Sequence, residues 1–289
     1  MKEQTITGHT KLTGLLGSPV AHSISPLMHN LAFQLKNLNY VYLCFDVGTK
    51  DLKTVTDAFR IMNVRGFNLT MPDKTRMFEL ADSVSPAAEL IGAANTVVQE
   101  NGKLTAYNTD GTGYMRAVQD AGYNIIGKRM TLLGCGGAAT AIAVQAALDG
   151  VEQITLVNRQ GPSFVRARQL ADTLSTRTSC QVSICSLEDS TELKKVLDQS
   201  DILTNATPAG MAPHEEQCPL PDSSLLHPEL IVSDIIYNPR STKLMQMAQE
   251  VGCPVFNGLY MLLYQGAEAF RLWTGVDMPI TDVKNAYFQ

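Results

Sequence analysis

The sequence contains no run of lysine and arginine residues, and no apolar segment reaches the roughly 18 residues that a membrane-crossing helix needs. Its 23 basic and 28 acidic residues give a net charge of −5, so the chain lacks the positive surface that binds nucleic-acid phosphates. The first ten residues contain no apolar signal-peptide core. We therefore expect a cytoplasmic protein without nucleic-acid partners and without membrane association.

The six cysteines include no Cys-x-x-Cys pair, and His9, His29, His214 and His227 show no metal-ligand spacing. These absences argue against a zinc ribbon, a thioredoxin-type motif and a zinc-dependent alcohol dehydrogenase. We expect reduced, mostly buried thiols and no metal. With 45% hydrophobic and 18% charged residues the composition is globular, and 289 residues suffice for about two domains.

Short β-rich runs alternate with amphipathic stretches from Lys11 to Thr70, which predicts a parallel α/β sheet. Two short helices and two further strands follow, up to residue 107. A helix over 112–121 then leads to a strand over 129–133 and a second α/β series. The sequence thus predicts an α/β fold of two domains. The first comprises 1–110, with C-terminal helices of 264–289 returning to it, and the second comprises 111–263.

A glycine-rich turn opens the second series. Gly134-Cys135-Gly136-Gly137-Ala138 lies between a predicted strand and an alanine-rich helix, as in Rossmann-type dinucleotide-binding domains. The alternative is a turn of small residues without a ligand. At the end of the next strand, Asn158-Arg159 offers a cation and no carboxylate. This favours NADP slightly over NAD, although Arg159 could also stack on the adenine of either nucleotide.

Three polar clusters lie at the ends of predicted elements of the first domain, where open α/β sheets place their ligands. They cover residues 17–26, 68–74, and 92–96 with 108–111. Ser25 precedes Pro26 and therefore also fits a helix N-cap. Lys74 and Asp110 could together take the proton of an alcohol without a metal. Taken singly, each could be a surface charge, and Asp110 could cap the helix that follows.

Further motifs are Asn-Ala-Thr-Pro-Ala-Gly-Met (205–211), Asp-Ile-Ile-Tyr-Asn-Pro (234–239) and Asn-Gly-Leu-Tyr-Met-Leu-Leu-Tyr-Gln-Gly (257–266). In this order the motifs resemble those of the shikimate dehydrogenase family, including its quinate/shikimate dehydrogenase branch, over about residues 12–275. The resemblance implies a substrate-binding first domain and a dinucleotide-binding second domain. It also implies NAD(P)-linked interconversion of 3-dehydroshikimate and shikimate in the biosynthesis of chorismate and aromatic amino acids.

The resemblance also implies roles for individual residues. Lys74 matches the catalytic lysine of the family and Asp110 its partner. The substrate contacts would be Ser23, Ser25, Thr70, Asn95, Tyr237 and Gln265. The cofactor contacts would be Gly134, Cys135, Gly136, Gly137 and Ala138 at the pyrophosphate, Asn158 and Arg159 at the adenosine, and Ile236 and Gly258 at the nicotinamide.

One departure from the family pattern bears on the cofactor. The Asn-Arg pair continues with Gln160 and Gly161, where NADP-using members usually carry Thr and a nearby second basic residue. NADP(H) is therefore only slightly favoured, and NAD(H) is possible. Two other functions stay open, a quinate/shikimate dehydrogenase acting in the degradative direction and a catalytically silent dinucleotide sensor. The sequence leaves a homodimer possible.

Overall fold

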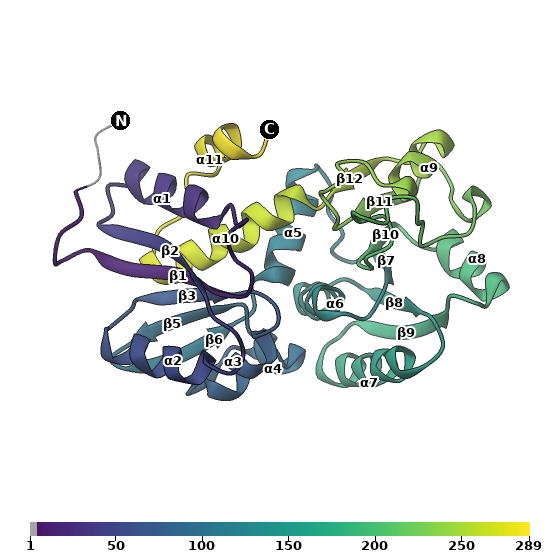
Figure 1. The fold of residues 1–289 in the computed structure, drawn as a ribbon. Helices are drawn as coiled ribbons and strands as arrows, with labels where there is room; N and C mark the ends of the chain where they lie inside the picture. The colour runs from purple at the N-terminus through teal and green to yellow at the C-terminus, as the bar shows by residue number, and fades with distance from the viewer. Residues whose placement is uncertain (1–4) are drawn as a thin grey trace. The chain divides into compact units, whose positions relative to one another are not determined.

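The computed structural model describes residues 5–289, which form two compact units (Figure 1). Unit 1 combines the segment that ends at Thr109 with Leu263–Gln289, and unit 2 is Asp110–Leu262. Each unit is built around a six-stranded sheet with helices. The predicted α/β fold class is confirmed.

Unit 1 holds a mixed sheet in the order β2-β1-β3-β5-β6-β4. β1 pairs in parallel with β2 and β3, as the alternating pattern predicts, whereas β5 is antiparallel to both β3 and β6. Its elements are β1 (Lys11–Gly17), α1 (Ser25–Leu35), β2 (Tyr40–Asp46), α2 (Leu52–Ile61), β3 (Gly66–Leu69), α3 (Lys74–Leu80), β4 (Ser83–Val84), α4 (Pro86–Ile91), β5 (Thr96–Glu100), β6 (Lys103–Tyr107), most of α10 (Leu259–Thr274) and α11 (Ile280–Tyr287).

The C-terminal helix α10 completes the core of unit 1. The Trp273 indole is buried and donates a hydrogen bond to the Val97 carbonyl at 2.9 Å. It fills the space beside Gly66, where an added Cβ would lie 2.3 Å from the indole. The ring of His29, on α1, stacks on Tyr42 with 4.5 Å between centroids. The chain end is therefore part of the first sheet's hydrophobic packing, although it follows unit 2 in the sequence.

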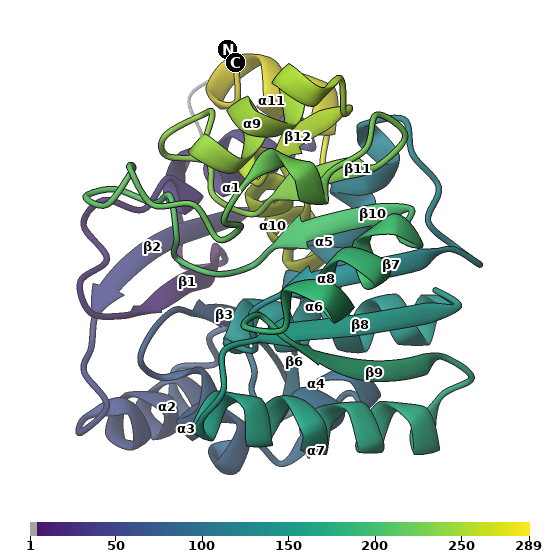
Figure 2. The same cartoon turned by 90° about the vertical axis from the view of Figure 1, so that its right-hand side faces the viewer.

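Unit 2 holds an entirely parallel sheet in the order β12-β11-β10-β7-β8-β9, and Figure 2 shows the strands from β11 to β9 side by side. This is the doubly wound order, whose switch point lies between β7 and β10. Its elements are α5 (Asp110–Asp120), β7 (Arg129–Leu133), α6 (Gly137–Asp149), β8 (Gln153–Asn158), α7 (Pro162–Arg177), β9 (Gln181–Ser186), α8 (Ser190–Asp198), β10 (Ile202–Asn205), a 3-10 turn (Ser223–Leu225), β11 (Ile231–Asp234), α9 (Lys243–Val251) and β12 (Val255–Asn257).

The structure differs from the sequence-based expectations at α9, at β4 and at the start of α1. Helix α9 was not predicted, although Thr242 caps it by accepting the Met245 N–H and Gly252 ends it with φ +97°. The two-residue strand β4 was also missed. The interpretation of Ser25 as an N-cap is wrong, because Ser25 is the first helical residue of α1 and no side chain caps this helix. Instead Ser23 Oγ accepts the Ser25 N–H at 3.2 Å.

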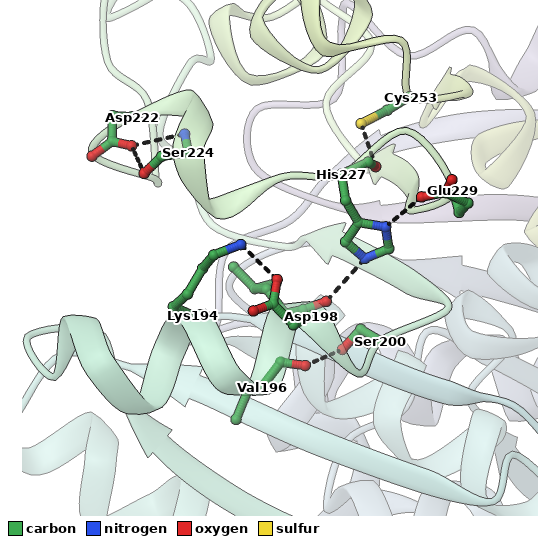
Figure 3. Close-up of polar contacts among 10 residues, drawn as sticks. Lys194, Val196, Asp198, Ser200, Asp222, Ser224, His227, Glu229 and Cys253 are labelled. Atoms are coloured by element: carbon green, nitrogen blue, oxygen red, sulfur yellow. Dashed lines mark hydrogen bonds and ion pairs between the residues drawn. The ribbon is translucent and has the colours of Figure 1, made fainter.

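His227 links three segments of unit 2 and is structural (Figure 3). Its Nδ1 lies 3.2 Å from the Glu229 carboxylate and its Nε2 lies 3.3 Å from the Leu197 carbonyl at the end of α8. The Cys253 thiol donates to the His227 carbonyl at 3.2 Å. All six cysteines are free thiols. Within residues 5–289 no helix is both long enough and apolar enough to cross a membrane.

Candidate functional site

The glycines of the turn after β7 have two different effects. Gly134 has φ +101°, and an added Cβ would lie 3.0 Å from the Ala206 carbonyl at the end of β10. Gly136 precedes α6 in an extended conformation, and a Cβ on Gly136 or Gly137 would meet no atom within 4 Å. The first glycine thus allows a close approach of two strand ends. The other two leave open space at the positive end of helix α6, where anions bind favourably.

A cavity of about 340 Å³ lies at this turn, at the switch point of the sheet. Its lining comes from the carboxyl ends of β7, β8, β9 and β10, the start of α7 and the loop after β10: Leu133, Gly134, Cys135, Gly136, Val157, Asn158, Arg159, Ser163, Arg166, Leu187, Ala206, Thr207, Pro208, Ala209, Gln217 and Pro219. Five of the predicted cofactor residues are among them, namely Gly134, Cys135, Gly136, Asn158 and Arg159. A concave site of this size at a switch point suits a dinucleotide.

Local hydrogen bonds fix the polar groups of this cavity. The Arg166 guanidinium donates to Ser163 at 3.2 Å, and the Thr207 hydroxyl donates to Asn205 Oδ1 at 2.7 Å. Burial raises the pKa of the Cys135 thiol more than nearby Arg166 lowers it, so the thiol is neutral at pH 7. Thr207 is a lining residue that was not among the predicted cofactor contacts. The motif 205–211 combined with the adjacency of β7 and β10 could have identified it.

The remaining predicted cofactor residues of unit 2 lie outside that lining. Gly137 and Ala138 form the first turn of α6. The Gly258 N–H donates to the Ile236 carbonyl at 3.2 Å, and an added Cβ on Gly258 would lie 1.9 Å from the Ile235 carbonyl. Gly258 is therefore required for the close packing of two backbone segments. Tyr237 follows Ile236 and is 46% exposed.

Unit 1 contains a buried network of polar side chains that spans three strands. The Tyr42 hydroxyl donates to Asn68 Oδ1 at 2.8 Å, and Asn68 Nδ2 donates to Thr96 Oγ1 at 2.9 Å. Burial raises the pKa of Tyr42 well above its ordinary value, and a hydrogen bond with Ser25 only partly offsets this. The phenol therefore stays protonated and can keep donating. The predicted substrate residue Ser25 is thus joined to a network that no local sequence pattern indicates.

The amide of Asn95 has a fixed orientation. Its Oδ1 accepts the backbone N–H of Thr109 at 2.8 Å, and a backbone N–H can only donate. Its other amide atom is therefore Nδ2, which can donate to Thr109 Oγ1 at 3.0 Å and to Gln265 Oε1 at 3.5 Å. The structure brings together two predicted substrate residues that lie 170 positions apart.

Thr70 and Ser23 lie in the loops at the carboxyl ends of β3 and β1. The Thr70 N–H donates to the Leu16 carbonyl at 3.0 Å, and its methyl group would be 2.3 Å from a Cβ on Gly17. Gly17 therefore lets Thr70 pack directly against the loop that carries Ser23. The Ser23 hydroxyl also hydrogen-bonds the Cys44 thiol, whose pKa is raised mainly by burial.

Lys74 is the first residue of α3, is half-buried, and accepts the Ala94 N–H on its backbone carbonyl at 2.9 Å. This contact joins the start of α3 to the segment that carries Asn95. The carboxylate of the preceding residue, Asp73, is fully buried and accepts a hydrogen bond from Thr49 at 2.7 Å. Asp110 is the first residue of α5, in unit 2. The catalytic roles of Lys74 and Asp110 stay predictions.

The chain is similar to known proteins over almost its whole length. Residues 15–97 match the family described as shikimate dehydrogenase substrate binding domain, and residues 258–286 match the shikimate 5'-dehydrogenase C-terminal domain. Shikimate dehydrogenase (NADP(+)) of Listeria innocua is 50% identical over 285 residues, which covers 99% of this chain and 98% of that protein.

Two solved structures place the fold in the same group. Shikimate 5-dehydrogenase from Listeria monocytogenes, in complex with shikimate and NAD, has a TM-score of 0.95 and 50% identity, covering 99% of this chain and 98% of that one. Quinate dehydrogenase from Corynebacterium glutamicum, in complex with NAD, has a TM-score of 0.85 and 30% identity, covering 96% and 98%. On the 50% identity that extends over nearly both full lengths, the chain belongs to the shikimate dehydrogenase family.

Proposed function

We propose that the protein is a shikimate dehydrogenase, an NAD(P)-linked oxidoreductase that interconverts 3-dehydroshikimate and shikimate in aromatic amino acid biosynthesis. The observation that carries the proposal is the oriented amide of Asn95 beside Gln265, in a unit whose sequence matches a substrate binding domain. Relatives at 50% identity support it, because one is named a shikimate dehydrogenase (NADP(+)) and another is described with shikimate and NAD bound.

The cavity of unit 2 fits a dinucleotide. Open space at Gly136 and Gly137 suits a pyrophosphate against the start of α6. Residues 134–138 would hold the pyrophosphate, Asn158 and Arg159 the adenosine, and Ile236 with Gly258 the nicotinamide. When bound, the dinucleotide supplies or accepts a hydride. Arg159 and Arg166 favour NADP(H), while NAD(H) can use the same cavity.

The chain's own groups then bind the substrate and move its proton. The hydroxyls of Ser23 and Ser25 hold the substrate carboxylate, and Thr70, Asn95, Tyr237 and Gln265 contact the ring hydroxyls. Lys74 takes the hydroxyl proton during oxidation and returns it during reduction. Asp110 orients that hydroxyl and stabilises the positive charge of Lys74.

A direct test is the absorbance of the reduced nicotinamide after shikimate is added with NADP+ or with NAD+. We expect reduced nucleotide to form, faster with NADP+. The same assay with quinate separates the proposal from the degradative branch, for which quinate would be turned over faster. A protein that reduces neither nucleotide with either substrate would instead fit a silent sensor. Light scattering on the same sample decides whether the protein is a homodimer.

A further inference from the structure

A carboxylate reaches the end of β8 from the neighbouring strand, although the sequence has none after β8 itself. β8 pairs in parallel with β9 (Figure 2), and Asn158 lies opposite Ser186. The Leu187 N–H donates to the Asn158 carbonyl at 2.9 Å and so ties the two strand ends together. Glu188 is the next residue. Its side chain therefore meets the turn that follows β8.

Glu188 is held in this turn by two neighbours. Both of its carboxylate oxygens lie 3.3 Å from the backbone nitrogen of Gln160, which donates to them. The Ser186 hydroxyl donates to Oε2 at 2.6 Å. This hydrogen bond is the main cause that lowers the pKa of Glu188, and the charge of Arg159 lowers it further. Glu188 is therefore a fixed negative charge at neutral pH.

Glu188 follows β9, but its side chain reaches the turn at which doubly wound folds distinguish the two dinucleotides. In doubly wound folds the residues after the second strand of the series contact the adenosine ribose, and that strand here is β8. An acidic group there accepts a hydrogen bond from the free 2′-hydroxyl of NAD, whereas a cation binds the 2′-phosphate of NADP. The cavity wall supplies the cations Arg159 and Arg166. Glu188 lies beside this wall and already occupies the Gln160 N–H, a donor that a phosphate could otherwise use.

We infer that Glu188 sets the balance between NADP and NAD in this protein. Its carboxylate acts as an internal anion at the phosphate-recognition turn, because it uses the Gln160 N–H and opposes the positive charge of Arg159. It accepts a hydrogen bond from a ribose hydroxyl and repels a 2′-phosphate. This role rests on the dinucleotide binding proposed above and adds to it the residue that limits NADP preference.

Calorimetric titration with NADP+ and with NAD+ tests the inference without requiring turnover. Glu188→Gln removes the charge and keeps the size of the side chain. We expect NADP+ affinity to rise about tenfold relative to NAD+ affinity, since repulsion of a doubly charged phosphate is lost. The matched control is Glu229→Gln, which makes the same charge change. Glu229 lies before the amino end of β11 and pairs with His227 (Figure 3), whereas the cavity lies at the carboxyl ends of the strands.

Two further measurements separate this charge effect from a structural one. Ser186→Ala frees the carboxylate without removing its charge, and the affinity ratio should move in the same direction by a smaller amount. In 0.5 M salt the difference between wild type and Glu188→Gln should shrink, because the repulsion is screened. An affinity ratio unchanged within twofold in Glu188→Gln, with both nucleotides still binding, overturns the inference alone. A protein that binds neither nucleotide overturns the proposed function, and the inference with it.

Discussion

The two units form their candidate sites from different groups: unit 2 uses mainly backbone and unit 1 mainly side chains. In unit 2 the cavity is built around a backbone turn, where Gly136 and Gly137 leave open space at the start of α6. In unit 1 the candidate site relies on side chains from separate strands and loops: Tyr42 donates to Asn68, Asn68 donates to the Asn95 backbone carbonyl, and the Asn95 amide is oriented by Thr109. A pyrophosphate can be bound by backbone N–H groups, whereas a polyol needs donors and acceptors at fixed positions.

This difference decides how each site responds to mutation. A backbone site changes when a side chain is added where none belongs. A side-chain site changes when a donor or acceptor is removed, and its supporting residues matter as much as those that would touch the ligand. The two kinds of effect can be measured separately, as dinucleotide affinity and as substrate turnover.

Loss of Lys74 should give the largest effect and should be confined to the chemistry of unit 1. Lys74→Ala removes the group that moves the hydroxyl proton, so we expect kcat to fall roughly 10²- to 10⁴-fold. Dinucleotide affinity should stay within about twofold of the wild type, since the cavity is formed by unit 2 alone. Steady-state kinetics and calorimetry give the two numbers. Lys53→Ala, at an exposed lysine of unit 1, serves as the control. Unchanged turnover in Lys74→Ala would show that Lys74 takes no part in the mechanism.

Acid should destabilise unit 1 through His29. Its ring is fully buried, both nitrogens lack hydrogen-bond partners, and burial lowers its pKa from 6.5 to about 3. The unfolded chain takes up a proton below pH 6.5 and the folded chain does not, so this contribution to stability is complete above pH 6.5 and is lost as pH falls toward 3. At pH 4 the loss is about 3 kcal/mol.

Urea unfolding of wild type and His29→Phe at pH 7 and pH 4 measures this contribution. We expect the free energy of unfolding of His29→Phe to fall less between these values, because Phe cannot take up a proton in the unfolded chain. His214→Gln, at an exposed histidine of unit 2, should keep the wild-type pH dependence. Equal losses in wild type and His29→Phe would show that His29 is not the acid-sensitive group.

A side chain at Gly136 should weaken dinucleotide binding without weakening the fold. Its φ of −82° suits any residue, and an added Cβ meets no atom within 4 Å. Gly136→Val should therefore raise the Kd of NADP+ about thirtyfold, by about 2 kcal/mol, because it blocks contact with the pyrophosphate. The melting temperature should stay near that of wild type. Gly134→Ala is the contrasting variant, because its φ of +101° and the nearby Ala206 carbonyl make it lose stability as well. An unaltered Kd in Gly136→Val contradicts the assignment of this turn.

Removal of one supporting hydroxyl should give the smallest effect. Tyr42→Phe leaves Asn68 Oδ1 without its donor, so we expect a loss of about 1 kcal/mol in unfolding free energy and a higher KM for shikimate. The matched variant is Tyr114→Phe in unit 2, whose buried hydroxyl hydrogen-bonds Thr204 at 2.5 Å. It should lose similar stability with no change in KM for shikimate. Equal KM values in the two variants would mean that the Tyr42 network does not position the substrate site.

The sequence predicted the fold class and most elements because their hydrophobic periodicity is local. Helix α9 was missed, although both of its boundary signals, the Thr242 cap and the terminal Gly252, are local in the sequence. Ser25 was misread, because proline biases the residue before it away from helical angles, yet Ser25 is already the first helical residue of α1. The Asn95 to Gln265 contact could not be read at all, since no local pattern joins residues so far apart.

The amino-acid sequence by itself determined the glycine turn, the identity of the polar groups and the alternation that builds two α/β units, because each depends on neighbours within a few residues. Only the tertiary structure decided which amide atom of Asn95 points toward Gln265, which tyrosine supports Asn68, and that Glu188 meets the turn after β8. These properties depend on strand pairing and on the return of α10 to unit 1, which set distances that sequence order leaves undefined.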